Sequence, residues 1–159
     1  MTFLREKCLK FVLTFFFFVG GYSVLMAKST VFLFMPGLVG SDVELRVDGE
    51  FISKVETPVK KHYEFDDNNN WDITKPGWVK IEFEKSEKII LSLYNFFETT
   101  VKKEFMAEIQ LNLFEDSTDY IEYKFKGMND FKIVRIDEKS ALKKMKNKKI
   151  CPLPDIIVK

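Results

Sequence analysis

The fold is decided by residues 31–55, which read VFLFMPGLVGSDVELRVDGEFISKV. Three short strands are predicted in this stretch: residues 31–34, which end at Pro36-Gly37, then residues 42–47 and residues 50–55. Asp48-Gly49 between the last two is a strong hairpin signal, because a type I′ turn needs positive φ at both central residues and Asp and Gly tolerate it. The stretch therefore predicts β-structure that opens with a hairpin.

The chain after this hairpin continues as short strands separated by turn residues. Residues 78–85, WVKIEFEK, alternate apolar and charged side chains, which is typical of a strand with one buried face. Residues 66–72, DDNNNWD, are predicted to form a polar loop. Further strands are predicted at residues 61–65, 88–94, 101–114, 120–125 and 131–136. Many short strands with no long helical period between them favour an all-β fold over residues 28–136, an antiparallel β-sandwich or barrel.

The last part of the chain, residues 137–159, changes character. Asp137 is a plausible N-cap for a short helix over residues 138–146, with an acidic residue first and lysines last, as the helix dipole prefers. The tail CPLPDIIVK contains Pro152 and Pro154, which exclude a helix and predict an extended strap.

The first 27 residues have the layout of a secretory signal. Three basic residues precede residues 11–27, FVLTFFFFVGGYSVLMA, which contain no charged side chain. Two outcomes stay open: cleavage after Ala27, where charge and strand pattern resume, or retention as an uncleaved membrane anchor. In both cases the positive-inside rule places the rest of the chain outside the cytoplasm. We therefore expect an exported protein in the periplasm or envelope of a bacterium.

Composition excludes several classes of protein. With 159 residues, 46% hydrophobic and 31% charged, the chain is predicted to form one globular domain with a core. The formal net charge is +1, and the part after residue 27 is close to neutral, so we expect no nucleic-acid partner. Cys8 lies in the N-terminal segment. We interpret Cys151 as an unpaired thiol, with a disulfide between two chains as the alternative.

No catalytic set or cofactor site is predicted. His62 is the only histidine, so any Ser-His-Asp or multi-histidine site needs it, and no serine or cysteine stands in a nucleophile motif. We interpret His62 as structural, because an isolated titratable residue without a placed partner usually is.

The polar loop offers one candidate metal site. Oxygen-bearing side chains occupy every second position, a spacing that can wrap Ca²⁺, at Asp66, Asn68, Asn70 and Asp72. The calcium-loop signature has glycine at its sixth position and glutamate at its twelfth, where this chain has Trp71 and Gly77. We interpret the loop as an Asx-rich turn, with Ca²⁺ binding as the alternative.

Two patches are candidates for partner contact. Residues 143–149 contain five lysines in seven positions, which can contact anionic phospholipid headgroups, lipopolysaccharide or an acidic partner. We prefer to interpret them as a solvated helix end. Phe96-Phe97, next to Tyr94, form either an exposed aromatic patch or part of the core, and the core is the commoner case in a sandwich.

Several of these features follow one another in a characteristic order: Pro36 after the first strand, Val39-Gly40-Ser41, the strand over residues 43–47 with Asp48-Gly49, Tyr63, Pro76-Gly77, Tyr120-x-x-Tyr123 and residues 138–141. This order resembles the bacterial envelope family catalogued as domain of unknown function 2846. Met35 stands where arginine is usual, and the lipidated cysteine common in that family is missing. The resemblance implies a small exported β-sandwich, immunoglobulin-like or transthyretin-like, and brings no catalytic residues.

The sequence thus predicts an exported envelope protein that acts as a non-enzymatic binding or structural module. Its expected partner is another envelope protein or the membrane surface. One alternative is an accessory subunit of an envelope complex, held at the inner membrane by residues 11–27. A third possibility, an envelope glycan hydrolase, requires a cleft with converging carboxylates.

Overall fold

The computed structural model describes residues 28–37, 42–64, 70–84, 87–97, 102–125 and 131–159. The segment predicted to be a signal or anchor, residues 1–27, lies outside this part of the chain. No helix within the described residues is long and apolar enough to cross a membrane. The strands are β1 (Ser29–Met35), β2 (Asp42–Val47), β3 (Glu50–Val55), β4 (Val59–Glu64), β5 (Asn70–Thr74), β6 (Gly77–Phe83), β7 (Lys88–Phe97), β8 (Lys102–Asn112), β9 (Thr118–Phe125), β10 (Phe131–Arg135), β11 (Cys151–Pro152) and β12 (Ile156–Val158), and the short helix is α2 (Glu138–Met145).

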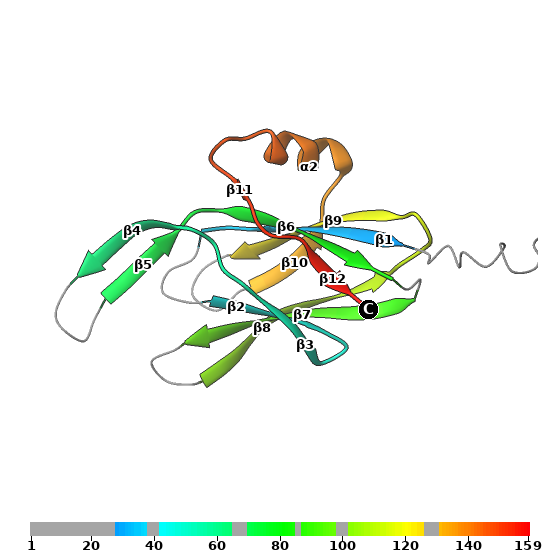
Figure 1. Cartoon of the computed structure of the whole chain (residues 1–159), viewed down its shortest axis with the longest axis horizontal. Helices are drawn as coiled ribbons and strands as arrows, with labels where there is room; N and C mark the ends of the chain where they lie inside the picture. The colour runs from blue at the N-terminus through cyan, green and yellow to red at the C-terminus, as the bar shows by residue number, and fades with distance from the viewer. Residues whose placement is uncertain (1–27, 38–41, 65–69, 85–86, 98–101, 126–130) are drawn as a thin grey trace, which may run out of the picture.

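Two sheets face each other across one hydrophobic core (Figure 1). The first sheet has the strand order β10-β9-β1-β6, and both β11 and β12 pair with β6 at its edge; the second has the order β3-β2-β7-β8. Alternate side chains of these strands point into the core and are fully buried, among them Leu33, Leu45, Ile81, Leu91 and Ile121. The prediction of an all-β fold with one core is therefore confirmed.

The prediction that the strands are antiparallel throughout is wrong for the first sheet. β1 pairs antiparallel with β6 but parallel with β9, and β11 and β12 pair parallel with β6. A short hairpin imposes antiparallel pairing only on strands that follow each other in sequence. The parallel neighbours of β1 and β6 are far away along the chain, so no hairpin sets their direction, and the sheet is mixed.

The opening hairpin, β2–β3, is present as predicted. Asp48 and Gly49 have φ values of 50° and 86°, as a type I′ turn requires. The turn is also fixed to the neighbouring strand β7. The Asp48 amide donates to the Ile90 carbonyl at 2.9 Å, and the Asp48 carboxylate accepts from the Ile90 amide at 2.8 Å.

A second hairpin, β4–β5, extends beyond the two sheets (Figure 1). The predicted loop over residues 66–72 is wrong in its last part, because Asn70 and Asp72 belong to β5 and pair with β4. Three consecutive asparagines, which usually mark turns, conceal the start of this strand. At the base of the hairpin a Cβ atom on Gly37 would lie 2.3 Å from the Thr74 carbonyl oxygen, so only glycine fits there.

Helix α2 lies against the outer face of the first sheet (Figure 1). Asp137 caps it as predicted, accepting hydrogen bonds from the Ser140 amide at 2.9 Å and the Ser140 hydroxyl at 2.7 Å. Ala141 is fully buried, and Lys144 Nζ lies 2.7 Å from Glu122 Oε1 on β9. The predicted extended tail is also present, as β11 and β12 along β6.

Candidate functional site

A row of aromatic side chains and one arginine crosses the outer face of the second sheet. Its members come from four neighbouring strands in the spatial order β3, β2, β7 and β8: Phe51, Arg46, Tyr94 and Phe105. Phe51 stands opposite Arg46 in the ladder, and Tyr94 stands opposite Phe105. We call these four residues the aromatic–arginine strip.

Strand alternation explains why these side chains face outward. Leu45 and Val47 on β2, and Leu91 and Leu93 on β7, point into the core, so Arg46 and Tyr94 point the other way. Residues opposite each other on paired strands share a face, which places Phe51 and Phe105 on the same outer surface.

Direct contacts connect three of the four residues of the strip. The Arg46 guanidinium carbon lies 4.8 Å from the centre of the Tyr94 ring, a cation–π contact. The Tyr94 and Phe105 rings meet edge to face, with centroids 5.6 Å apart and planes at 73°. Phe51 is 55% exposed and Phe105 is 54% exposed. Two large exposed apolar side chains on one sheet face, with an arginine and a tyrosine in contact on the strands between them, form the kind of surface that marks an interaction site.

A buried ion pair holds Arg46 in this position. Glu44 is only 2% exposed although it lies on the outer face of its strand, and its Oε1 lies 2.7 Å from Arg46 Nε and 2.6 Å from Arg46 Nη2. Arg46 Nη1 also donates to the Gly49 carbonyl at 3.2 Å. A buried carboxylate needs such a partner, because an unpaired buried charge is costly. The guanidinium is therefore fixed over Tyr94 before any partner arrives.

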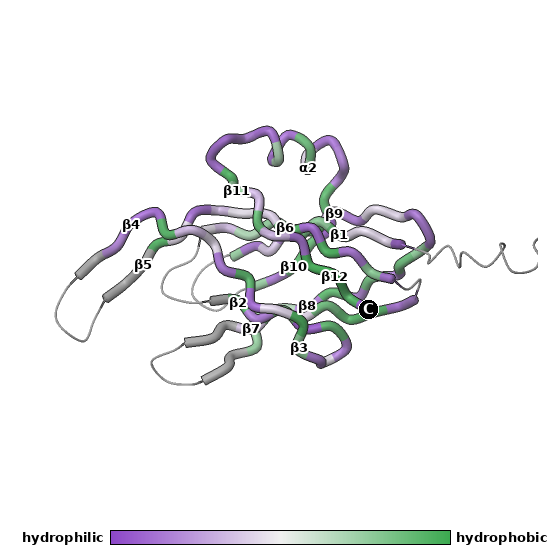
Figure 2. Tube along the Cα trace, viewed as in Figure 1, coloured by the Kyte–Doolittle hydropathy of each residue, from purple (hydrophilic) through white to green (hydrophobic). Residues whose placement is uncertain are grey.

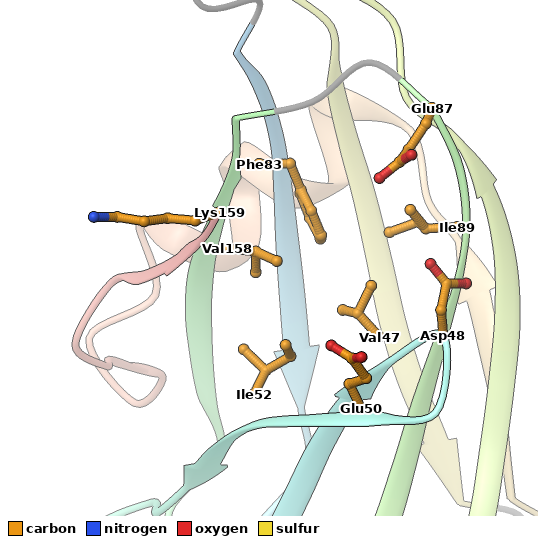
Figure 3. Close-up of a pocket in the computed structure, with 9 residues that line it drawn as sticks. All are labelled: Val47, Asp48, Glu50, Ile52, Phe83, Glu87, Ile89, Val158 and Lys159. Carbon is orange, nitrogen blue, oxygen red and sulfur yellow. The ribbon is translucent and has the colours of Figure 1, made fainter.

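A cavity of about 300 Å³ opens between the edges of the two sheets (Figure 3). Its apolar lining consists of Val47, Ile52, Phe83, Ile89 and Val158. Asp48, Glu50 and Glu87 supply carboxylates at this cavity, while the Lys159 side chain points away from it in Figure 3. The Asp48 carboxylate already accepts the Ile90 amide, so it serves the turn. In the described part of the chain, no group of three or more His, Cys, Asp or Glu side chains is placed to hold a metal ion.

The structure describes only some of the residues singled out in the sequence. Asp66 and Asn68 of the candidate Ca²⁺ site lie outside the described residues, whereas Asn70 and Asp72 lie in β5 instead of a loop. His62 is exposed on β4, opposite Asp72 in the ladder.

Cys151 and the pair Phe96-Phe97, which the sequence also singled out, lie in other strands. Cys151 is a half-buried free thiol in β11, and Cys8 lies outside the described residues. Phe96 and Phe97 fall in β7, without a described side-chain position. An aromatic contact on the same strand is described nearby, between Tyr94 and Phe105. Sequence alternation alone signals that Arg46 and Tyr94 face outward, but their contact depends on a pairing between distant strands.

Titratable groups with shifted pKa values lie elsewhere. Burial raises the pKa of the Tyr123 phenol well above its ordinary value, and its hydroxyl lies 3.8 Å from Met106 Sδ in the core. The hydrogen bond from Lys80 lowers the pKa of Glu82 and raises that of Lys80, on the outer face of the first sheet. These shifts have structural causes: core burial in one case and a surface ion pair in the other.

The chain matches no protein-family model, no curated protein and no solved structure. The resemblance to the envelope family thus stays a prediction.

Proposed function

We propose that this chain is an exported module of the bacterial cell envelope that binds another envelope protein and catalyses no reaction. The observation that carries the proposal is the aromatic–arginine strip on the outer face of the second sheet. The charge-free apolar stretch of residues 11–27 behind three basic residues supports export.

The composition of the strip favours a protein partner. Tyrosine, phenylalanine and arginine are enriched at protein interfaces, and tyrosine and arginine dominate their hot spots. Arg46 is already paired with Glu44, so a partner that covers it need not supply a new counter-charge. A fixed guanidinium also loses little side-chain entropy on binding, which lowers the cost of association.

The two exposed phenylalanines supply enough apolar area to matter. An aromatic side chain buries roughly 150–250 Å², and Phe51 and Phe105 are 55% and 54% exposed. Covering both removes on the order of 200 Å² of apolar surface from water, which is worth roughly 5 kcal/mol before the cost of association.

We also propose a more specific fold for the chain. Within the all-β class we place the chain among the immunoglobulin-like or transthyretin-like sandwiches. The supporting observation is the arrangement of two sheets around one core.

Two forms of the protein are compatible with this recognition surface. In the first, cleavage near Ala27 releases a free envelope protein; in the second, residues 11–27 hold an accessory subunit at the inner membrane. N-terminal sequencing of the protein isolated from cells separates them, because a start near Lys28 excludes the tether.

Photo-crosslinking in cells tests the recognition surface. A benzophenone amino acid is placed at Phe51 or at Phe105, and the matched controls are Phe114 and Phe125, which are 68% and 56% exposed but lie outside the strip. We expect the same crosslinked partner from both strip positions and from neither control. Phe105→Ser should abolish the crosslink formed from position 51. Equal crosslinking from all four positions, or none from the strip, contradicts the proposal.

A further inference from the structure

Helix α2 and the turn after it concentrate positive charge. Residues 138–149 contain six lysines and one glutamate, a net charge of +5 in a chain of formal net charge +1, so the remaining residues together carry −4. Figure 2 shows this segment mostly in the hydrophilic colour. A nearly neutral chain thus has one strongly basic segment.

Most of these lysines have no internal role. Lys144 pairs with Glu122 and fastens the helix to β9. The other five are exposed, and none of them forms an ion pair with another described residue: Lys139, Lys143, Lys146, Lys148 and Lys149. Because Lys144 and the buried Ala141 fix the helix, the exposed lysines are presented on a rigid element.

Three of the lysines form a stripe with an apolar centre. Lys139, Leu142, Lys143 and Lys146 are spaced as i, i+3, i+4 and i+7, which puts them on one face of a helix. Leu142 is 42% exposed. Together with Glu138, these residues line a shallow hollow of about 570 Å³. We call the three lysines and Leu142 the α2 stripe.

We propose that the α2 stripe docks the protein on anionic phospholipid headgroups at a membrane surface. Lysines bind lipid phosphates through charge, and an apolar side chain among them can enter the boundary between headgroups and acyl chains. Helix α2 protrudes from the first sheet (Figure 1), and a protruding element suits a flat surface. This inference is independent of the proposed protein partner, because the strip lies on the other sheet.

The favoured ligand follows from the apolar centre of the stripe. An RNA or a polypeptide of acidic residues alone, such as polyglutamate, would satisfy the lysines through charge and offer no apolar side chain to Leu142. A bilayer satisfies both the lysines and the leucine. Each lysine near an anionic surface raises the affinity about fivefold. The three lysines together therefore raise it roughly 100-fold.

Lysine footprinting on the full chain tests the inference without any substitution. Acetylation rates are measured by mass spectrometry with vesicles of phosphatidylcholine, with and without phosphatidylglycerol. Lys139, Lys143 and Lys146 should react several-fold more slowly only when phosphatidylglycerol is present, and Lys60 and Lys88 serve as exposed internal controls. Residues 1–27 carry Arg5, Lys7 and Lys10 and are themselves attracted to phosphatidylglycerol. Protection of the α2 stripe is therefore measured relative to Lys60 and Lys88 in the same sample. The protection should disappear in roughly 1 M salt, where the Debye length is about 3 Å.

A charge-matched pair of variants completes the test. Lys139→Gln/Lys143→Gln/Lys146→Gln should weaken the phosphatidylglycerol-dependent binding roughly 100-fold. The control variant removes the same charge from the exposed residues Lys60, Lys88 and Lys132. It should bind nearly as well as the original chain. Equal losses in the two variants, protection by pure phosphatidylcholine, or protection only by polyglutamate or RNA would overturn the inference.

Discussion

The ion pair within the second sheet predicts a large and specific loss of stability. Glu44 is 2% exposed and is held by two short contacts from Arg46, at 2.7 and 2.6 Å. Arg46→Met replaces arginine by an unbranched side chain without a charge. Glu44 then loses this counter-charge while its carboxylate stays buried, and the Gly49 carbonyl loses a donor.

The expected cost follows from the burial of the two partners. Removing one partner of a fully buried ion pair costs about 3–5 kcal/mol. The Arg46 side chain is 25% exposed, so water screens part of this interaction, and we expect about 3 kcal/mol, at the low end of that range. In a chain of this length that corresponds to a fall in Tm of roughly 6–12 °C. Glu44→Met/Arg46→Met removes both charges and should lie within about 1 kcal/mol of the original chain.

Urea unfolding followed by tryptophan fluorescence measures both variants. The control is Lys144→Met, which breaks the pair with Glu122, where the side chains are 34% and 19% exposed. A pair this accessible to water contributes less than about 1 kcal/mol. The reasoning is refuted if Arg46→Met costs no more than Lys144→Met, or if the double variant is as unstable as Arg46→Met.

Three further predictions concern the turns and the helix. Gly37→Ala brings a Cβ atom to 2.3 Å from the Thr74 carbonyl oxygen, so it should destabilise the fold by about 1–3 kcal/mol in urea unfolding. Gly49→Val forces a β-branched residue to a φ of 86° and should lower Tm and yield, whereas Gly49→Asn should be much milder. If Gly49→Val instead left folding intact and abolished partner binding, the turn would be a site. The hydrogen bonds from Ser140 lower the pKa of Asp137, so its capping contribution should be complete above the ordinary Asp pKa. It should be lost as pH falls through the lowered pKa. An NMR titration of the Ser140 amide should report that midpoint, and Asp137→Asn should remove it.

Local signals in the sequence predicted most of the elements. Asp48-Gly49 predicted the turn because a type I′ turn depends on the backbone preferences of two adjacent residues. Strict alternation of apolar and charged residues predicted β6, because that pattern too lies within one short segment. Asp137 predicted the start of α2, since capping depends only on residues two or three positions apart. Pro152 and Pro154 predicted an extended tail because proline excludes a helix.

Contacts between distant segments escaped prediction. The parallel pair β1–β9 and the contact of Arg46 with Tyr94 both depend on which strands become neighbours, and no local pattern encodes that choice. Glu44 shows the consequence. Alternation correctly places it on the outer face of β2, where a glutamate is ordinarily exposed, but pairing with Arg46 leaves it buried. The aromatic–arginine strip is for this reason visible only in the folded chain.

The two proposed surfaces lie on opposite sides of the molecule. Helix α2 lies on the outer side of the first sheet (Figure 1). The aromatic–arginine strip lies on the outer face of the second sheet. Facing sheets are about 10 Å apart, and a packed helix adds roughly another 10 Å. Contacts on the two surfaces are therefore on the order of 20 Å apart, too far for one ligand to block the other directly. A protein partner and an anionic membrane should bind at the same time, so phosphatidylglycerol vesicles should leave crosslinking from Phe105 undiminished. Competition between them would mean that at least one surface has been placed on the wrong side.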